Sequence, residues 1–422
     1  MRVAHVLRKY DPSEWGGTES AILQLTTDLS KIGVESVIHA PRHPPKAGSA
    51  DRIAASERGV RRFRGLVPVV GISAKQKAQL VAVGGNLISF DLMGSLCLER
   101  GLDVVHSHAQ GRLGAIARVV AGARRLPFVI SIHGGLYDIP AEVREGLRRP
   151  GAVGWDWGRA LGLMLRARDL MNQADAIITF NPSEAALIRE RHPGRRVLTE
   201  PHGVPTAVFA RECTGAALDA YPRLGGRSVL LVLGRIDPTK NQDWLIAQAA
   251  ELSRRHPKAL LVFVGAATDR EYGEAIQARI EREGLGDFVM MVGSLPFGDS
   301  RLIGLLQLAR AVVLPSKSET FGMVIVEAWA SGTPVISSRT SGAAALITEG
   351  VNGLLFDLDR PETFHAAVDI VLTQGELAAR WGAAGREKAV AEYDTSIRAN
   401  RMRRLYEDLV EEKNALRHSS GR

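Results

Sequence analysis

Two glutamates separated by seven residues, Glu319 and Glu327, flank a short turn that contains Gly322. The turn follows an apolar run ending at residue 314 and leads into an apolar, helix-forming stretch, so we expect a helix to begin there. The first N–H groups of a helix lack intrahelical acceptors and attract anions or hydroxyl oxygens. We therefore predict a hydroxyl-binding or anion-binding turn that uses both carboxylates and the backbone of Phe321, Gly322, Met323 and Val324. A capped helix with Glu327 in solvent is the alternative.

Two cations, Arg235 and Lys240, lie in a turn after the apolar run at 229–233. Cations at the carboxyl end of a strand suit the binding of a diphosphate. Two surface charges around a turn would give the same pattern.

A paired glycine, Gly16-Gly17, stands between the first apolar run and the first amphipathic segment. Glycines allow the backbone to approach a phosphate closely. An ordinary loop with Thr18 as helix cap is the alternative.

Histidines gather where apolar runs end, at His106, His108, His133 and His202. A metal site needs convergent ligands, and these residues lack H-x-x-x-H spacing, so we expect no metal. We expect His133 to contact a substrate instead.

Short apolar runs alternate with amphipathic segments along the whole chain, which predicts strands joined by crossover helices. The expected strands are 4–7, 36–40, 104–107, 128–133, 176–179, 196–199, 229–233, 260–264, 289–292, 311–314, 335–338 and 353–356. Little polar alternation indicates parallel strands covered on both faces. The prediction is an α/β protein with two doubly wound domains, a linker over 203–227, an amphipathic helix over 396–410 and a frayed tail over 414–422.

The 422 residues carry a formal charge of +8, and the excess is unevenly placed. Residues 1–205 hold 28 Lys/Arg and 19 Asp/Glu, whereas the remainder is nearly neutral. This predicts an anionic partner or membrane surface for the first half, although an arginine-rich composition without a site would look the same. The basic clusters lack interleaved aromatic residues, which argues against nucleic acid.

Two cysteines exclude a disulfide scaffold and a four-ligand zinc site. We expect buried thiols in a reducing compartment. No apolar run reaches the roughly 20 residues of a membrane span, and no signal peptide is visible, so the expected location is cytoplasmic, with peripheral attachment to the inner membrane face as a further hypothesis.

Taken in order, these motifs resemble the retaining family-four glycosyltransferases ("glycosyl transferases group 1") of the GT-B fold. The resemblance rests on Gly16-Gly17, His133-Gly134, Asn181-Pro182-Ser183-Glu184, residues 234–240, the glutamates Glu319 and Glu327, and Ser331-Gly332-Thr333-Pro334-Val335-Ile336. It implies an acceptor-binding domain at 1–205, a nucleotide-sugar-binding domain at 206–395, a cleft between them, and a helix at 396–412 that packs back on the first domain. One departure is His202-Gly203-Val204-Pro205, where the family usually has Asn-Gly-Val-Asp.

The resemblance also implies roles. Arg235 and Lys240 would hold the donor diphosphate with Gly16 and Gly17, while Glu319 and the turn after it would hold the donor sugar, Glu327 the ribose, and Gly293 would border the donor. The implied catalytic residues are His133, Arg235, Lys240 and Glu319. Acceptor contacts are expected from Arg8, Lys9, Tyr10, His106, His108 and Tyr137.

The resemblance implies that no metal or other cofactor is needed, which fits the cations here, since they can stabilise a leaving diphosphate. The donor would be a nucleoside-diphosphate sugar, and the acceptor a glycan, a lipid-linked sugar or a small molecule, which the basic first half suggests is anionic. A phosphorylase or sugar-nucleotide epimerase of the same fold, or a basic non-catalytic protein, are the alternatives.

Overall fold

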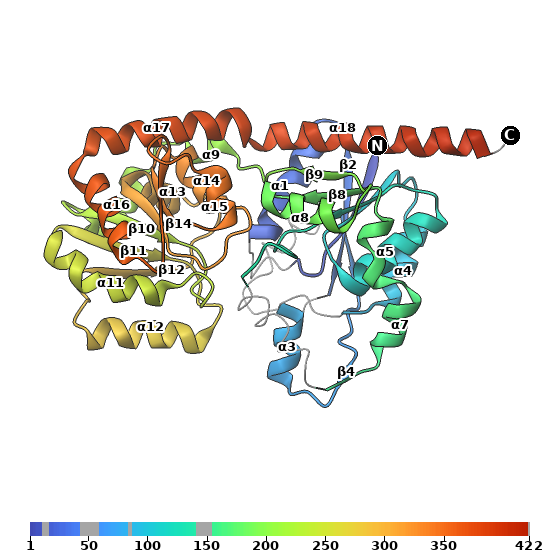
Figure 1. Cartoon of the computed structure of the whole chain (residues 1–422), viewed down its shortest axis with the longest axis horizontal. Coiled ribbons are helices and arrows are strands. Elements are labelled where there is room, and N and C mark those ends of the chain that lie inside the picture. The colour runs from blue at the N-terminus through green and yellow to red at the C-terminus, as the bar shows by residue number, and fades with distance from the viewer. Residues whose placement is uncertain (11–16, 43–58, 83–86, 141–153, 421–422) are drawn as a thin grey trace. The chain divides into compact units, whose positions relative to one another are not determined.

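The computed structural model describes residues 1–10, 17–42, 59–82, 87–140 and 154–420 (Figure 1). The chain forms two compact units. The N-terminal unit comprises Met1–Gly203 and Thr395–Arg422, and the C-terminal unit comprises Val204–Asp394. Each unit is built on one parallel β-sheet with its own hydrophobic core.

The sheet of the N-terminal unit has the strand order β3-β2-β1-β5-β6-β8-β9, and every pair is parallel. Its strands are β1 (Arg2–Val6), β2 (Glu35–Pro41), β3 (Val60–Phe63), β5 (Val104–Ser107), β6 (Phe128–Ser131), β8 (Ala176–Thr179) and β9 (Val197–Thr199). The order reverses between β1 and β5. In a doubly wound sheet, ligands bind at the carboxyl ends of the strands beside such a reversal.

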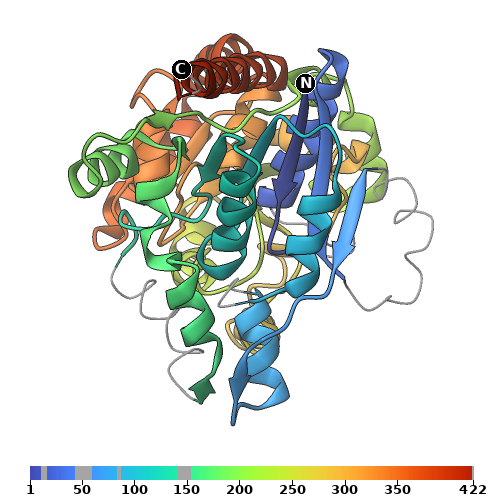
Figure 2. The same cartoon turned by 90° about the vertical axis from the view of Figure 1, so that its right-hand side faces the viewer.

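Helices cover this sheet because its strands are apolar on both faces. The helices of this unit are α1 (Gly17–Lys31), α3 (Ala74–Ala82), α4 (Phe90–Leu98), α5 (Gly111–Ala123), α7 (Gly158–Met164), α8 (Pro182–Arg191) and α18 (Thr395–Ser420), with the 3-10 turns η2 (Ala167–Asp169) and η3 (Met171–Gln173). Figure 2 shows α5 in front of the strands, and its residues Leu113, Ile116 and Val120 are buried in the core. Strands β4 (Val69–Val70) and β7 (Trp155–Asp156) form a separate antiparallel pair.

The long helix α18 packs beside α1 in the same unit (Figures 1 and 2). Its residues Met402 and Tyr406 are fully buried. The Arg398 side chain is also buried, and one of its N–H groups donates to the backbone oxygen of Ala21 on α1 at 3.4 Å. The last helix of the chain therefore supplies core residues to the N-terminal unit.

The sheet of the C-terminal unit has the order β12-β11-β10-β13-β14-β15, again with parallel pairs. Its strands are β10 (Ser228–Leu233), β11 (Ala259–Val264), β12 (Val289–Gly293), β13 (Ala309–Leu314), β14 (Val335–Ser338) and β15 (Gly353–Phe356). Its helices are α9 (Thr206–Phe209), α10 (Thr214–Ala220), α11 (Gln242–Arg255), α12 (Arg270–Arg282), α13 (Ser300–Leu308), α14 (Met323–Ala330), α15 (Ser341–Leu346), α16 (Pro361–Thr373) and α17 (Gly375–Glu392), with the 3-10 turn η4 (Pro222–Leu224). Here the order reverses between β10 and β13.

The α/β fold class with two doubly wound sheets is confirmed. The predicted linker over 203–227 is wrong, because this stretch forms α9, α10 and η4, and Phe209 is completely buried. The predicted frayed tail is also wrong, since α18 continues to Ser420. The thiols are not buried as expected: Cys97 is exposed and Cys213 is half-buried. Among the described residues, no helix is both long and apolar enough to cross a bilayer.

Candidate functional site

In the C-terminal unit, the predicted cations and carboxylates meet where the strand order reverses. The loop after β10 carries Lys240, and the loop after β13 carries Glu319; the Lys240 ammonium forms an ion pair with the Glu319 carboxylate. The hydroxyl of Ser316 donates to the same carboxylate oxygen at 2.9 Å. The backbone N–H of Lys317 also donates to the carbonyl of Thr239 at 2.8 Å, so the two loops are joined by backbone as well as by charge.

An aspartate that sequence reasoning passed over shapes the first of these loops. One oxygen of Asp237 accepts the N–H groups of Thr239 at 3.0 Å and of Lys240 at 3.1 Å. Its other oxygen pairs with the Arg235 guanidinium at 3.0 Å. Aspartate commonly closes such turns on its own backbone. Lys240 is therefore held toward Glu319, while the Arg235 side chain stays 55% exposed and available to a ligand.

The turn predicted to bind hydroxyls begins helix α14, with Gly322 before its first residue. Gly322 has φ +93°, a left-handed conformation that side chains rarely adopt. Met323 and Val324 then supply the first N–H groups of the helix, which have no intrahelical acceptor. The N–H of Gly342 donates to the Glu319 carbonyl at 2.8 Å, and a Cβ at Gly342 would come within 2.5 Å of that oxygen. The start of α15 therefore packs directly against this turn.

Glu327 lies inside α14, and its side chain is buried. The alternative of a solvated Glu327 is thus wrong. Burial raises the pKa of Glu327 from 4.5 to about 7, and the nearby Lys240 charge opposes that rise. A carboxyl group that ionises near neutral pH inside a protein is typical of functional sites. Its contact with a ribose stays a prediction.

Gly293 is the last residue of β12, has φ +81° and is exposed. Its carbonyl accepts the N–H of Gly265 at 2.8 Å. Gly265 in turn follows β11 and touches the loop after β10, since a Cβ there would lie 1.8 Å from the Gly234 oxygen. The ends of three adjacent strands are therefore bound together beside Lys240.

In the N-terminal unit, histidines occupy the strand ends beside the order reversal. His5 on β1 and His106 on β5 are register partners, and His108 and His133 follow β5 and β6. His5 Nδ1 lies 3.1 Å from His108 Nε2, and His108 Nδ1 lies 2.8 Å from His133 Nε2. Three imidazoles thus form a hydrogen-bonded chain that ends at His133. The ring of His202 stacks on that of His133 with centroids 5.3 Å apart.

His106 is held separately, by the Tyr406 hydroxyl at Nδ1 (2.6 Å) and the Ser131 hydroxyl at Nε2 (2.8 Å). His106 and His108 were predicted to contact an acceptor, and both predictions are wrong. Both rings are buried, and both nitrogens of each ring are already used within the protein.

Burial keeps these imidazoles neutral. It lowers the pKa of His5 to about 3 and the pKa of His108 and His133 well below 6.5, and the Arg398 guanidinium lowers all three further.

Ring nitrogens of His5, His106 and His108 lie within 4.8 Å of one another, which is compatible with a metal cluster. A bound ion would have to displace the hydrogen bonds of His106 and His108 and would carry its charge close to Arg398. The residues therefore fit a hydrogen-bonded chain better than a metal centre. The expectation that no metal is needed stays a prediction.

The remaining predicted residues are scattered around the first strand ends. Arg8 and Lys9 follow β1 and are partly exposed. Tyr10 is completely buried in a core cluster, so its predicted acceptor contact is wrong. Gly17 is the first residue of α1, and Gly16 lies outside the described residues.

Tyr137 is held by helix α8 and by the loop that contains it. Its ring lies 4.1 Å from the Arg191 guanidinium, and its hydroxyl lies 3.1 Å from His192 Nε2. The Glu184 carboxylate accepts the N–H groups of Leu136 (2.9 Å), Tyr137 (3.1 Å) and Asp138 (2.7 Å). Glu184 thereby fixes the loop after His133. The spacing Asn-x-x-Glu at 181–184 signals a helix cap, but only the structure shows what its carboxylate holds.

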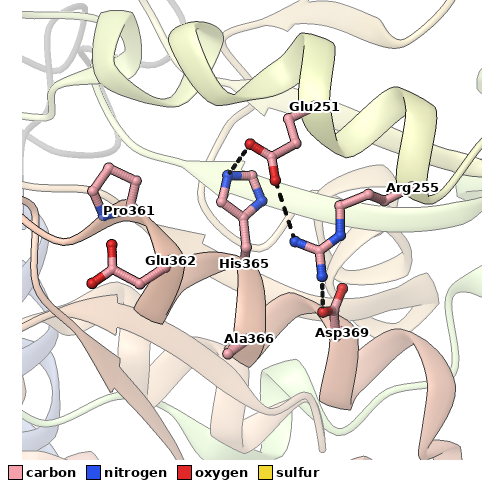
Figure 3. A pocket seen from close by; sticks show the side chains of 7 residues that line it. All are labelled: Glu251, Arg255, Pro361, Glu362, His365, Ala366 and Asp369. Carbon is pink, nitrogen blue, oxygen red and sulfur yellow. Dashed lines mark hydrogen bonds and ion pairs between the residues drawn. The ribbon is translucent and has the colours of Figure 1, made fainter.

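A pocket in the C-terminal unit lies away from these loops, between α11 and α16 (Figure 3). Its lining is charged and mutually paired: Arg255 bridges Glu251 and Asp369, and His365 lies 3.5 Å from Glu251. None of the predicted site residues lines it.

Two family models match the chain, one in each half. The model of "Glycosyltransferase Family 4" matches residues 15–208, and that of "Glycosyl transferases group 1" matches residues 219–388. The D-inositol 3-phosphate glycosyltransferase of Nocardiopsis dassonvillei is 31% identical over 88% of this chain and 92% of its own length. That of Corynebacterium glutamicum is 26% identical over 98% of each chain. Among solved structures, HepE of Anabaena in complex with UDP superposes with a TM-score of 0.73, at 16% identity, over 97% of this chain and all of that one.

Proposed function

Because the chain belongs to the family-four, group 1 glycosyltransferases and is a glycosyltransferase of the GT-B fold, we propose that it moves a sugar from a nucleoside-diphosphate donor to a hydroxyl of a phosphorylated small molecule. We further propose that the anomeric configuration is retained, as the family resemblance implies, and that no metal is required. The observation that carries the proposal is the Lys240–Glu319 pair beside the first turn of α14.

This pair has the chemistry that a sugar diphosphate needs. Lys240 and Arg235 supply cations for the diphosphate, and Glu319 can accept hydrogen bonds from sugar hydroxyls. The N–H groups of Met323 and Val324 add donors at the positive end of the helix dipole. Solved neighbours with this fold contain UDP or UDP-glucose, which supports a uridine diphosphate sugar as the first donor to test.

The proposed acceptor rests on charge and on the relatives' printed names. Residues 1–203 and 395–422 hold 35 Lys/Arg against 23 Asp/Glu, so the N-terminal unit carries the positive charge of the chain. Arg8 and Lys9 are partly exposed at the end of β1, beside the reversal of strand order. Cations at this edge favour an acceptor with a phosphate group, and the two relatives described above are named for D-inositol 3-phosphate.

In the proposed reaction, the bond from the anomeric carbon to the diphosphate oxygen breaks and a bond to the acceptor oxygen forms on the same face. The acceptor proton passes to the leaving phosphate. Negative charge develops on that phosphate, and fixed cationic side chains can stabilise it without a metal ion. His133 is neutral, and its Nε2 is already hydrogen-bonded to His108. In this scheme His133 therefore contacts the substrate and does not remove a proton.

The test measures transfer from a panel of nucleotide sugars to inositol 3-phosphate and to unphosphorylated inositol. We expect turnover with the phosphorylated acceptor, a product with the donor's anomeric configuration by NMR, and unchanged rates after exhaustive chelation. Lys240→Ala is expected to lower kcat about 100-fold to 1,000-fold. Lys258→Ala is the matched control. Lys258 is exposed and lies just before β11, at the amino-terminal end of the strand, whereas Lys240 lies beyond the carboxyl end of β10 in the same sheet. Equal rates in Lys240→Ala and Lys258→Ala would refute the assignment of the donor site.

A further inference from the structure

The histidine chain at the edge of the N-terminal sheet contains two hydrogen bonds among three rings, those of His5, His108 and His133. A neutral imidazole carries one N–H and one lone pair. Each bond needs one donor and one acceptor, so the proton position on one ring dictates the positions on the other two. The chain has only two arrangements: all three protons on Nδ1, or all three on Nε2.

The two ends of the chain decide between these arrangements. With all protons on Nε2, the N–H of His5 would be on Nε2, which is buried and has no partner among the described residues. His5 is 0% exposed, so that nitrogen is shielded from bulk solvent. A buried N–H without an acceptor is costly and rare, whereas an unused lone pair is tolerated better. The arrangement with all protons on Nδ1 leaves only a lone pair at the His5 end.

At the other end, His133 is partly exposed and follows β6 at the edge where substrates are expected. Its Nδ1 is itself buried and has no partner among the described residues, as is true of His5 Nε2, but His133 as a whole is partly exposed, whereas His5 is not exposed at all. An N–H at His133 can therefore be completed by an oxygen atom of a bound substrate after a small movement of the side chain, and an N–H at His5 cannot. Resting on the proposed function, we propose that His5 and His108 are positioning residues that fix His133 as the Nδ1–H tautomer, which makes His133 a hydrogen-bond donor to the sugar or acceptor and not a general base.

The surroundings of the chain keep all three rings in their neutral form, on which this reasoning depends. Arg398, in the first turn of α18, is buried close to the histidines and lies over the Phe180 ring at 5.8 Å. Within the described part of the chain, no carboxylate comes close enough to pair with it. Its charge and the burial of the rings lower the pKa values of His5, His108 and His133. An imidazolium in this position would add a second positive charge beside Arg398.

The direct test is the tautomeric state of each histidine by NMR of protein labelled with nitrogen-15 in its imidazole rings. At pH 7 without ligands, we expect the signals of His5, His108 and His133 to show protonated Nδ1 and unprotonated Nε2. Assignment comes from single substitutions of each histidine. Nε2–H on His133, an imidazolium there, or displacement of these signals by stoichiometric Zn²⁺ would overturn the proposal. This measurement needs no substrate, so it stands even if the proposed donor or acceptor is wrong.

Two substitutions at His108 separate positioning from simple packing. In His108→Asn, the side-chain NH₂ takes the place of Nδ1 and can still donate to His133 Nε2. In His108→Asp, a carboxylate takes that place and can only accept, so His133 must carry its proton on Nε2. We expect His133 to keep Nδ1–H in the Asn variant and to change tautomer in the Asp variant.

We expect kcat to fall about 100-fold in His108→Asp, as for the loss of one preorganised donor, and to be largely kept in His108→Asn. Thermal unfolding of both variants shows that each is folded. If both variants are folded and lose activity equally while the His133 tautomer is unchanged, His108 is structural and the proposal fails. If neither variant nor wild type turns over any nucleotide sugar, the proposed function fails, and the tautomer measurement decides this inference alone.

Discussion

Replacing Glu327 by glutamine removes a titration that the structure places inside helix α14. The carboxyl group is buried, and burial raises its pKa to about 7 from 4.5 in the unfolded chain. Because the folded pKa is the higher one, folding favours the neutral acid. Below pH 4.5 both states are protonated and the group causes no loss of stability. Between pH 4.5 and 7 the unfolded chain ionises while the folded one does not, and stability falls as the pH rises.

The size of this effect follows from the two pKa values. A difference between 4.5 and about 7 corresponds to roughly 3 kcal/mol of unfolding free energy. Most of it, roughly 2–3 kcal/mol, is lost between pH 5 and pH 8. The amide of Glu327→Gln resembles the neutral acid in shape and does not titrate. The variant and the wild type should therefore be close in stability at pH 5, and the variant should be the more stable one at pH 8.

Urea unfolding of both proteins at pH 5 and pH 8 measures the difference, since all other titrating groups are shared. Lys240→Met is a second comparison: Lys240 lowers the pKa of Glu327, so its loss should steepen the pH dependence, and it should not do so when Glu327 is already glutamine. If the wild type and Glu327→Gln show the same pH dependence within about 0.5 kcal/mol, the raised pKa is refuted.

Three further outcomes follow from the contacts and the net charge of the N-terminal unit. Asp156→Ala should cost about 3–5 kcal/mol in urea unfolding, because it removes the carboxylate that pairs with the buried Arg112 guanidinium at 2.6 Å; a cost below 1 kcal/mol would contradict this. Glu184→Ala should cost about 2–4 kcal/mol and lower the melting temperature, since three backbone N–H groups lose their acceptor, and Glu184→Gln should lose less. Flotation with anionic vesicles should recover the protein at low salt and not at high salt, whereas no binding to either anionic or neutral vesicles would end the membrane hypothesis.

Most strands could be predicted from the sequence because each contains a short apolar run rich in Val, Ile or Leu. Strands β5, β8, β14 and β15 have the expected bounds, since each is buried on both faces and ends at a polar residue or turn. The stretch over 203–227 was wrongly predicted to be a linker because its prolines and glycines resemble those of a linker. Tertiary packing decides there instead: Phe209 and Leu224 are buried, and short helices form around them.

For the candidate site, motif spacing predicted which loops carry chemistry but not how their side chains pair. Lys240 and Glu319 lie 79 residues apart, and only the order of the strands brings them together. The same holds for Arg398, which a linear charge count places on a solvated amphipathic helix. In the structure it is buried beside five histidines from distant parts of the chain.

The residues at the two reversals of strand order differ in charge: they are charged in one unit and neutral in the other. The proposed chemistry accounts for this difference. In the C-terminal unit, the loops present charge: Lys240 faces Glu319, and Arg235 is half exposed, as suits a ligand whose leaving group gains negative charge. In the N-terminal unit, the strand ends present neutral imidazoles kept neutral by burial and by Arg398. A reaction in which the leaving phosphate takes the acceptor proton needs no ionisable base at these strand ends, and a neutral donor there can bind a substrate oxygen without competing for that proton. If His133 were instead the base, its free nitrogen would have to carry a lone pair, and the N–H at the buried end of the chain would have no acceptor among the described residues.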